Sequence, residues 1–301
     1  MIELTHVTKS FARTPAVSDV SLTIREAGIF GLIGTNGAGK STLLRLMAGV
    51  LRPDTGEITM DGAAIYNNPE TKARLFFIPD NPWFFPNGTA EDMKTYYASV
   101  YPSFDAHRFD QLLEAFGLDG QRRTRTYSKG MRKQLAVICG LASRPDYLLC
   151  DETFDGLDPV MRQAVKSLFA EDIDKYGLAP VIASHNLREL EDVCDHVGLL
   201  HRGGILLSED LESMKLGIYK IQCVFRHEAE SDDVLASLDL VRHEQRGRLH
   251  TMVVRADTAQ IKAAFTQTEM TFFEVLPLTL EEIFISETEV VGYDIKALIL
   301  D

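Results

Sequence analysis

The stretch GIFGLIGTNGAGKSTLLRLMAGVL, residues 28–51, decides the fold. Its first part, Gly28 to Ile33, is apolar, its middle, Gly34 to Lys40, is rich in glycine, and Ser41 to Leu51 has apolar residues at helical spacing. This order predicts a buried strand, a tight loop and a helix. The loop fits the pattern G-x-x-x-x-G-K-[ST], whose glycines let backbone N–H groups turn inward and form a concave site for an anion.

The residues that end this loop suit the chemistry of a nucleoside triphosphate. Lys40 can reach the β and γ phosphates, Ser41 can ligate Mg²⁺, and the N-terminus of the helix adds a positive dipole end. A structural glycine-rich turn is the alternative, and the flanking strand and helix argue against it. We expect the nucleotide to contact Gly34, Thr35, Asn36, Gly37, Ala38, Gly39, Lys40, Ser41 and Thr42.

A second predicted strand supplies the acids that a triphosphate hydrolase needs. The stretch YLLCDET, residues 147–153, starts with the continuous apolar run of a strand buried on both faces. Asp151 at its end is placed to hold Mg²⁺, and Glu152 is placed to activate a water molecule. A solvated turn with two adjacent acids is the alternative interpretation.

The bulk composition limits the compartment and the partners. The chain has 301 residues, with 31 Lys and Arg against 44 Asp and Glu, and its net charge of -13 argues against a nucleic-acid partner. No segment reaches the roughly 18 apolar residues that span a bilayer, so any membrane role must run through a partner. The four cysteines lack metal-ligand or disulfide spacing, which suits a reducing cytoplasm: Cys139, Cys150, Cys194 and Cys223.

In their order, these motifs and those around them resemble the nucleotide-binding subunit of ATP-binding cassette (ABC) transporters. The resemblance covers Met1 to about Glu212. It implies an α/β fold, a P-loop NTPase core with a parallel sheet, an antiparallel β subdomain and a helical subdomain inserted at about 84–145. We therefore expect an ABC ATPase domain over residues 1–213, with the cofactors ATP and Mg²⁺.

Two segments of the N-terminal half resemble family motifs on either side of the nucleotide. TKSFARTPAVSDVSL, residues 8–22, resembles the opening strands and places Phe11 where an aromatic ring stacks on adenine. FFIPDNPWFFPNGTAED, residues 76–92, lies where the family has its Q-loop, and Asp80 stands in place of the family's Gln. Asp80 could approach Mg²⁺ or could serve a plain turn. The aromatic residues after it belong either to the core or to the surface that meets a membrane partner.

The stretch YSKGM, residues 127–131, stands where the family has its Leu-Ser-Gly-Gly-Gln signature. The resemblance implies that Ser128 and Gly130 bind the γ-phosphate of the ATP held by a second subunit. Lys129 and Met131 depart from the family pattern. Taken alone, Ser128 could simply cap a helix that begins around Gly130.

The remaining catalytic roles also follow from the resemblance. Lys40, Glu152 and His185 are expected to be catalytic, with Ser41, Asp151 and Asp80 on the metal. His185 follows the apolar run of VIASHN at the predicted phosphate edge of a parallel sheet, although a lone histidine is usually structural. Asp158 would link two active sites across a dimer, although an Asp before Pro also starts helices.

The last part of the chain, residues 214–301, predicts a small α+β domain without a catalytic cluster. Strands are expected over 217–225 and 270–278, a hairpin that turns near Gly247, and short helices over 232–240 and 258–267. LTLEEIFISETE, residues 278–289, resembles the terminal helix of drug- and peptide-exporter ATPases. The histidines of this domain are expected to be exposed or in the hairpin: His227, His243 and His250.

The preferred function is the ATPase subunit of an ABC exporter that moves a drug, peptide or other amphiphile. Its expected partners are a second ATPase subunit, identical or different, and a separate transmembrane permease, with the chain at the inner face of the cell membrane. A soluble ABC-type ATPase with a resistance or regulatory role is the alternative. A P-loop kinase or GTPase would leave Ser128, Glu152 and His185 unexplained.

Overall fold

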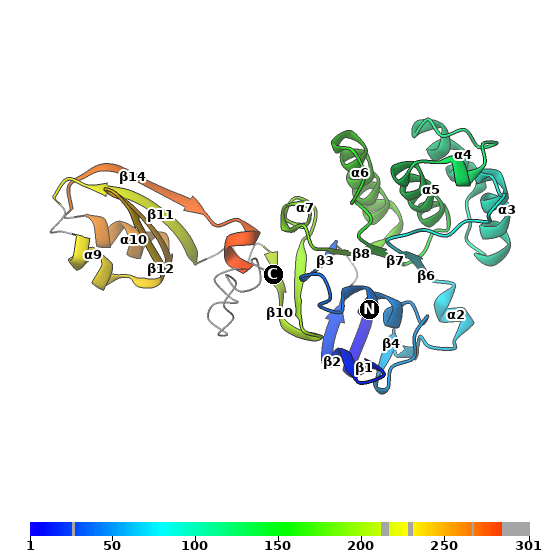
Figure 1. The fold of residues 1–301 in the computed structure, drawn as a ribbon, viewed down its shortest axis with the longest axis horizontal. Coiled ribbons are helices and arrows are strands. Elements are labelled where there is room, and N and C mark those ends of the chain that lie inside the picture. Colours follow the sequence, from blue (N-terminus) through cyan, green and yellow to red (C-terminus); the bar gives the residue numbers. More distant parts are fainter. Residues whose placement is uncertain (26–27, 212–216, 228–230, 267, 285–301) are drawn as a thin grey trace. The chain divides into compact units, whose positions relative to one another are not determined.

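The computed structural model describes residues 1–25, 28–211, 217–227, 231–266 and 268–284 (Figure 1). The chain divides into two compact units, Met1–Ser208 and Glu209–Asp301, each with its own cluster of buried hydrophobic side chains. The expected domain boundary at residues 213 and 214 lies outside the described residues. Among the described residues, none of the helices combines the length and the apolar character needed to cross a bilayer.

The centre of the first unit is a six-stranded sheet in the order β10-β9-β3-β8-β7-β6. Strand β3 is parallel to both β8 and β9, and β7 is parallel to both β6 and β8. Every residue of β3, β7 and β8 is buried, as expected for a parallel sheet covered on both faces. The strands are β3 (Phe30–Ile33), β6 (Leu75–Ile78), β7 (Tyr147–Asp151), β8 (Ala179–Ser184), β9 (His196–His201) and β10 (Gly204–Asp210).

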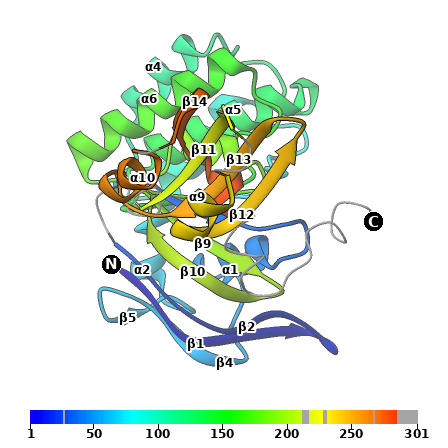
Figure 2. The same cartoon turned by 90° about the vertical axis from the view of Figure 1, so that its left-hand side faces the viewer.

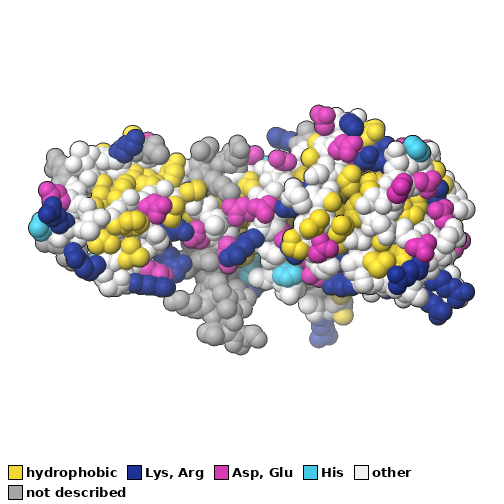
Figure 3. Space-filling model, turned by 90° about the horizontal axis from the view of Figure 1, so that it is seen from above, with side chains coloured by type: hydrophobic (Ala, Val, Ile, Leu, Met, Phe, Trp, Pro, Cys, Tyr) yellow, Lys and Arg dark blue, Asp and Glu magenta, His cyan; other side chains and the backbone are white. Residues whose placement is uncertain are grey.

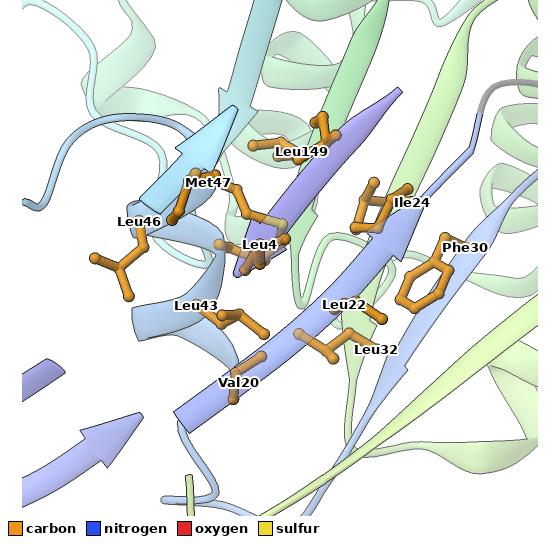
Figure 4. Close-up of a cluster of buried hydrophobic side chains, with 14 of the residues drawn as sticks. Leu4, Val20, Leu22, Ile24, Phe30, Leu32, Leu43, Leu46, Met47 and Leu149 are labelled. Carbon is orange, nitrogen blue, oxygen red and sulfur yellow. The ribbon is translucent and has the colours of Figure 1, made fainter. Parts of the chain in front are cut away.

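An antiparallel sheet in the order β2-β1-β4-β5 forms a second layer, which Figure 2 shows apart from the parallel sheet. It contains β1 (Ile2–Phe11), β2 (Thr14–Ile24), β4 (Thr55–Met60) and β5 (Ala63–Ala64). Inward side chains such as Leu4 and Leu22 pack with Leu43 and Met47 of helix α1 (Lys40–Met47) and with Leu149 of β7 (Figure 4). This shared core fixes α1 between the two sheets.

Helix α1 is shorter than the sequence pattern predicts. It ends at Met47 rather than Leu51, because Gly49 takes a left-handed backbone with φ of 61°. Val50, expected on the apolar face, is consequently exposed.

The remaining helices of the first unit begin at side-chain caps in most cases. Thr89, Asp105, Ser128 and Asp158 each accept a hydrogen bond from a backbone N–H in the first turn of the helix that they precede. These helices are α3 (Ala90–Val100), α4 (Ala106–Ala115), α5 (Lys129–Ala142) and α6 (Pro159–Tyr176). Shorter helices are α2 (Pro69–Lys72), α7 (Leu187–Glu191) and the 3₁₀ turn Thr124–Thr126. The antiparallel sheet and the helices around α5 confirm the expected ABC ATPase architecture.

The second unit is an antiparallel sheet in the order β12-β13-β11-β14, with two helices packed against it (Figures 1 and 2). The elements follow one another as strand, helix, strand, strand, helix, strand, which is the ferredoxin-like arrangement. They are β11 (Ile218–Phe225), α9 (Ser231–Ser237), β12 (Asp239–Arg246), β13 (Leu249–Arg255), α10 (Thr258–Phe265) and β14 (Met270–Pro277). The expected α+β class is thus confirmed. Of the expected terminal helix, residues 280–284 are helical, and 285–289 lie outside the described residues.

Two histidines of this unit lie in the hairpin, as expected: His243 is exposed and His250 is buried, and their rings stack in a way that the sequence did not predict. His243 on β12 and His250 on β13 stack with ring centroids 5.2 Å apart, and His243 Nε2 lies 3.1 Å from His250 Nδ1. His250 is only 1% exposed and contacts the ring of Phe225. The reason is register, since these strands bring two histidines seven residues apart onto neighbouring strands around the turn at Gly247.

Candidate active site

The glycine-rich loop between β3 and α1 has little room for side chains. Gly39 has a φ of 109°, and a Cβ added there would lie 2.2 Å from the backbone oxygen of Ala16. A Cβ on Gly34 would lie 2.5 Å from the backbone oxygen of Leu200. Gly37, with a φ of 80°, faces open space. The loop is therefore clamped by neighbouring backbone at two of its glycines and open at the third, as an anion site requires.

Lys40, the first residue of α1, turns its ammonium group back over this loop. Its Nζ donates hydrogen bonds to the backbone oxygens of Gly34 at 2.7 Å and Thr35 at 3.3 Å, and the side chain is 6% exposed. The same Nζ lies 3.5 Å from Glu152 Oε1. The cation is thus held at the loop and beside the acid that follows β7.

Ser41 and Asp151 meet between α1 and the end of β7. Ser41 Oγ donates a hydrogen bond to Asp151 Oδ1 at 2.9 Å, and Asp151 is 1% exposed. Burial raises the pKa of the Asp151 carboxyl, and the hydrogen bond from Ser41 opposes this shift. A buried carboxylate beside a hydroxyl offers the hard oxygen ligands that Mg²⁺ prefers, so these residues fit a divalent cation.

Glu152, whose carboxylate the sequence leads us to expect at the reacting water, directly follows β7. Its Oε2 lies 2.9 Å from Nδ1 of His185, which follows β8, while Oε1 faces Lys40. The Glu152 side chain is 16% exposed, and His185 is about half exposed. Glu152 also has a left-handed backbone with φ of 48°, which is uncommon outside glycine. The structure therefore brings all three expected catalytic residues into one cluster.

The signature segment lies at the start of α5. Ser128 Oγ accepts a hydrogen bond from the N–H of Met131 at 3.2 Å, so the capping interpretation is confirmed. Lys129 Nζ lies 2.7 Å from Asp155 Oδ2, and both side chains are mostly exposed. A Cβ on Gly130 would lie 3.0 Å from the backbone oxygen of Gly156. The segment is therefore packed against the loop that follows β7.

The other expected site residues have environments of their own. Asp158 caps α6, where its Oδ1 accepts from the N–H of Met161 at 2.9 Å. Phe11, at the end of β1, is 48% exposed, and Lys9 Nζ lies 6.0 Å from the centroid of its ring. Ala38 is buried, Thr42 is half-buried, and Thr35 and Asn36 are exposed.

One residue of the site, Lys133, was not predicted from the sequence. It is fully buried in α5, and its Nζ contacts Asp80 Oδ1 at 3.0 Å and the backbone oxygen of Glu152 in a short hydrogen bond. A signal was present, because Lys133 lies on the same helix face as Val137 and Gly140, both buried. A lysine on a buried helix face requires a partner.

The chain is similar in sequence to known ABC transporter proteins. The family model described as ABC transporter matches residues 17–155. The ABC transporter ATP-binding protein YtrB of Bacillus subtilis (strain 168) is 30% identical over 287 residues, which cover 95% of this chain and 98% of YtrB. The bacitracin transport ATP-binding protein BcrA of Bacillus licheniformis is 29% identical over 218 residues, 71% of each chain.

Solved structures agree as well. The structure of an ATP-binding subunit of an ABC transporter superposes with a TM-score of 0.67 at 27% identity, covering 71% of this chain and 92% of that one. The dimeric ATP-binding cassette MJ0796 bound to ADP and Pi gives a TM-score of 0.64 at 21% identity, and this likeness concerns the fold alone. The glycine-rich loop and the two acids at the end of β7 occur together with a similarity to YtrB over nearly the whole chain. The chain therefore belongs to the family of ABC transporter ATP-binding proteins, and it is an ABC ATPase.

Proposed function

We propose that this ATPase subunit closes with a second ATPase subunit around ATP and so drives a separate transmembrane subunit in the export of an amphiphile. The observation that carries the proposal is the position of the Glu152 carboxylate, held between Lys40 and His185 at the end of β7. A carboxylate so placed can accept a proton from a water that attacks the γ-phosphate.

Each group of the cluster has a distinct part in hydrolysis. Lys40 and the loop amides stabilise negative charge on the phosphates, and the His185 side chain orients the carboxylate and faces the γ-phosphate. Ser41 and Asp151 would hold Mg²⁺, which neutralises charge on the β and γ phosphate oxygens when bound. Phe11 would stack on the adenine.

Ser128, Gly130 and Asp158 have a different place in the proposal. Ser128 and Asp158 start helices α5 and α6, at ends whose N–H groups and dipoles favour an anion. None of the three takes part in the cluster of Lys40, Glu152 and His185 described above. This arrangement suits groups that complete the site of a second subunit, identical or different.

The segment after β6 supplies the surface for the membrane subunit. Phe84 is buried, but Trp83 is 63% exposed and stacks edge-on with Phe85 at 5.4 Å, and Phe85 does the same with Tyr96 of α3 at 5.3 Å. Exposed aromatic anchors of this kind suit a helix of a membrane partner. Such a contact would place the chain at the inner face of the membrane.

The names of two relatives support a class of cargo. Two of them, at 29% and 28% identity over 71% and 68% of this chain, are named for bacitracin transport, which supports a peptide or drug as cargo. Nucleic acid is not expected as a partner. On the face drawn in Figure 3, Lys and Arg side chains are interspersed with Asp and Glu rather than gathered into one basic field.

The test measures size in solution by light scattering, with and without Mg-ATP, together with phosphate release. The Glu152→Gln chain is expected to dimerise on ATP and to hydrolyse at least about a hundredfold more slowly than wild type. Wild type is expected to hydrolyse ATP and return to monomer. A Glu152→Gln chain that turns over ATP at the wild-type rate would remove Glu152 from the mechanism. Co-purification with a membrane subunit from the native host tests the transport role.

A further inference from the structure

Lys133 of α5 is a buried cation that contacts the backbone of Glu152. Its side chain is 0% exposed in the middle of an ATPase site that already contains Lys40. A lysine is rarely buried so completely unless its ammonium group is paired. The two partners described are the Asp80 carboxylate and the backbone oxygen of Glu152.

The second partner is unusual because it belongs to the residue with the reactive carboxylate. The Glu152 backbone is left-handed, a conformation that persists outside glycine only when its surroundings fix it. Its N–H donates to the backbone oxygen of Ala183 in β8 at 2.9 Å, and its oxygen accepts from Lys133 and from the N–H of Asp155 at 3.2 Å. The peptide group before the Glu152 Cα is therefore held by the sheet, and the one after it is held by α5 together with the turn at Asp155.

The first partner comes from the neighbouring strand in register. Ile78 of β6 pairs with Cys150 of β7, so Asp80 and Glu152 each lie two residues beyond a paired position. The loop that carries Asp80 is also fastened to α5 by Arg132, whose Nη2 donates to the backbone oxygen of Pro82 at 2.7 Å. Asp80 is about half exposed, so it can be reached from outside.

We propose that Lys133 is a positioning residue, which holds the left-handed backbone of Glu152 and links it to Asp80. In this assignment Asp80 acts as the counter-ion of Lys133 rather than as a ligand of the metal. A displacement of the loop after β6 would then reach the catalytic carboxylate through a single ammonium group. The inference rests on the proposed role of Glu152.

The experiment compares Lys133→Met, Asp80→Ala and the double variant in the full chain, by kcat and KM for Mg-ATP. Lys133→Met keeps an unbranched apolar side chain as far as Cε and removes the ammonium group. It is expected to lower kcat about ten- to hundredfold, because small misplacements of a catalytic group cost that much. KM and the equilibrium affinity for a fluorescent ATP analogue are expected to stay within about threefold, because the loop around Lys40 is untouched.

The double variant separates the two roles of Asp80. If Asp80 acts through Lys133, the double variant is no slower than Lys133→Met alone, because both changes remove the same link. If the fold-losses in kcat of the two single variants multiply in the double variant, the proposed link between Asp80 and Glu152 through Lys133 is wrong. The same holds if Asp80→Ala raises the Mg²⁺ concentration needed for half-maximal rate, because Asp80 then acts on the metal. Lys94→Gln is the matched control, since it removes another lysine ion pair, with Asp110 at 2.5 Å, away from Glu152.

A crystal structure of Lys133→Met gives a readout that does not depend on turnover. The φ of Glu152 is expected to leave the left-handed region, and the 2.9 Å contact between its Oε2 and His185 Nδ1 is expected to be lost. An unchanged Glu152 backbone would overturn the inference. Glu152→Gln, measured alongside, shows whether the role of Glu152 itself has failed.

Discussion

At the scale of single residues, two glycines of the nucleotide loop make a matched pair. Both have a positive φ, but a Cβ on Gly39 would meet the Ala16 backbone oxygen at 2.2 Å, while Gly37 faces open space. Gly37→Ala is expected to cost about 1 kcal/mol for the left-handed backbone. Gly39→Ala is expected to lower the free energy of unfolding by about 2 kcal/mol more than Gly37→Ala does, because the backbone at Ala16 must move to admit the methyl group.

Chemical unfolding and ATP binding of both variants measure this difference. Gly39→Ala is expected to lose ATP affinity along with stability, since the loop must open to admit the methyl group. Equal losses in the two variants would mean that backbone conformation alone sets the cost. The affinity of Gly37→Ala is informative separately, because its methyl group would point toward the space left open in the loop.

Much of the site was predictable because its residues occur in contiguous motifs. Lys40, Ser41, Asp151 and Glu152 follow from two short stretches whose strand and helix context is visible in the sequence. The contact between Lys133 and the Glu152 backbone was not predictable in this way. It depends on which helix face turns inward and on a left-handed φ at a non-glycine residue, neither of which a motif encodes.

At the scale of elements, Ser128 caps α5, and one substitution can separate this cap from its proposed contact with ATP in a second subunit. Ser128→Ala removes the cap of α5 and is expected to cost about 1 kcal/mol, whereas Ser128→Gly is expected to cost only a few tenths. Neither variant has the hydroxyl that would contact ATP in a second subunit. In a Glu152→Gln background, Ser128→Gly is therefore expected to remain folded and to lose ATP-driven dimerisation.

Light scattering with Mg-ATP and chemical unfolding of the same samples measure the two effects of Ser128 independently. A Ser128→Gly chain that dimerises as well as its parent would show that the backbone N–H groups of α5 suffice. The ion pair of Lys129 with Asp155 is a useful comparison. Since both side chains are mostly exposed, Asp155→Asn is expected to change stability by less than about 1 kcal/mol.

The hairpin of β12 and β13 is expected to lose stability in acid. Burial, and secondarily the neighbouring His250, lowers the pKa of His243 below its ordinary value of 6.5. The unfolded chain therefore takes up this proton at a higher pH than the folded chain does. The contribution of His243 to the free energy of unfolding is full above about pH 6.5 and falls as the pH drops from there toward the lowered folded pKa.

Histidine NMR titration of the full chain, compared with unfolding of wild type and His243→Gln at pH 7.5 and 5.5, measures this effect. The loss between the two pH values is expected to be smaller in the variant. The acid-induced loss of stability must be compared between wild type and the variant, because burial also lowers the pKa of His201 in the first unit. His201 therefore contributes a loss of stability of the same sign in both chains. An identical loss in both chains would exclude His243 as its source.

At the scale of the whole molecule, the sequence predicted the class of each unit better than its topology. The P-loop core followed from motif order, and the α+β class of the second unit from strand and helix patterns. The order β12-β13-β11-β14 could not be read from the sequence, because it depends on pairings between distant strands. The stacking of His243 on His250 was missed for the same reason.

We expect the two units of the chain to unfold in separate transitions. Each unit has a separate hydrophobic cluster, and every residue proposed to bind ATP or Mg²⁺ belongs to the first unit. The single tryptophan, Trp83, also belongs to the first unit, so tryptophan fluorescence reports on that unit while circular dichroism reports on both. We expect the two signals to give different unfolding curves.

Mg-ATP should then act on only one of these curves in the Glu152→Gln chain. A ligand at a hundred times its Kd adds about 2.7 kcal/mol to the stability of the unit that binds it, so the fluorescence midpoint is expected to rise. The circular dichroism signal also contains a transition of the second unit, which tryptophan fluorescence does not report. The midpoint of that transition is expected to be unchanged by Mg-ATP. If instead both signals coincide and move together, the two units unfold as one cooperative body, and ATP in the first unit stabilises the accessory domain too.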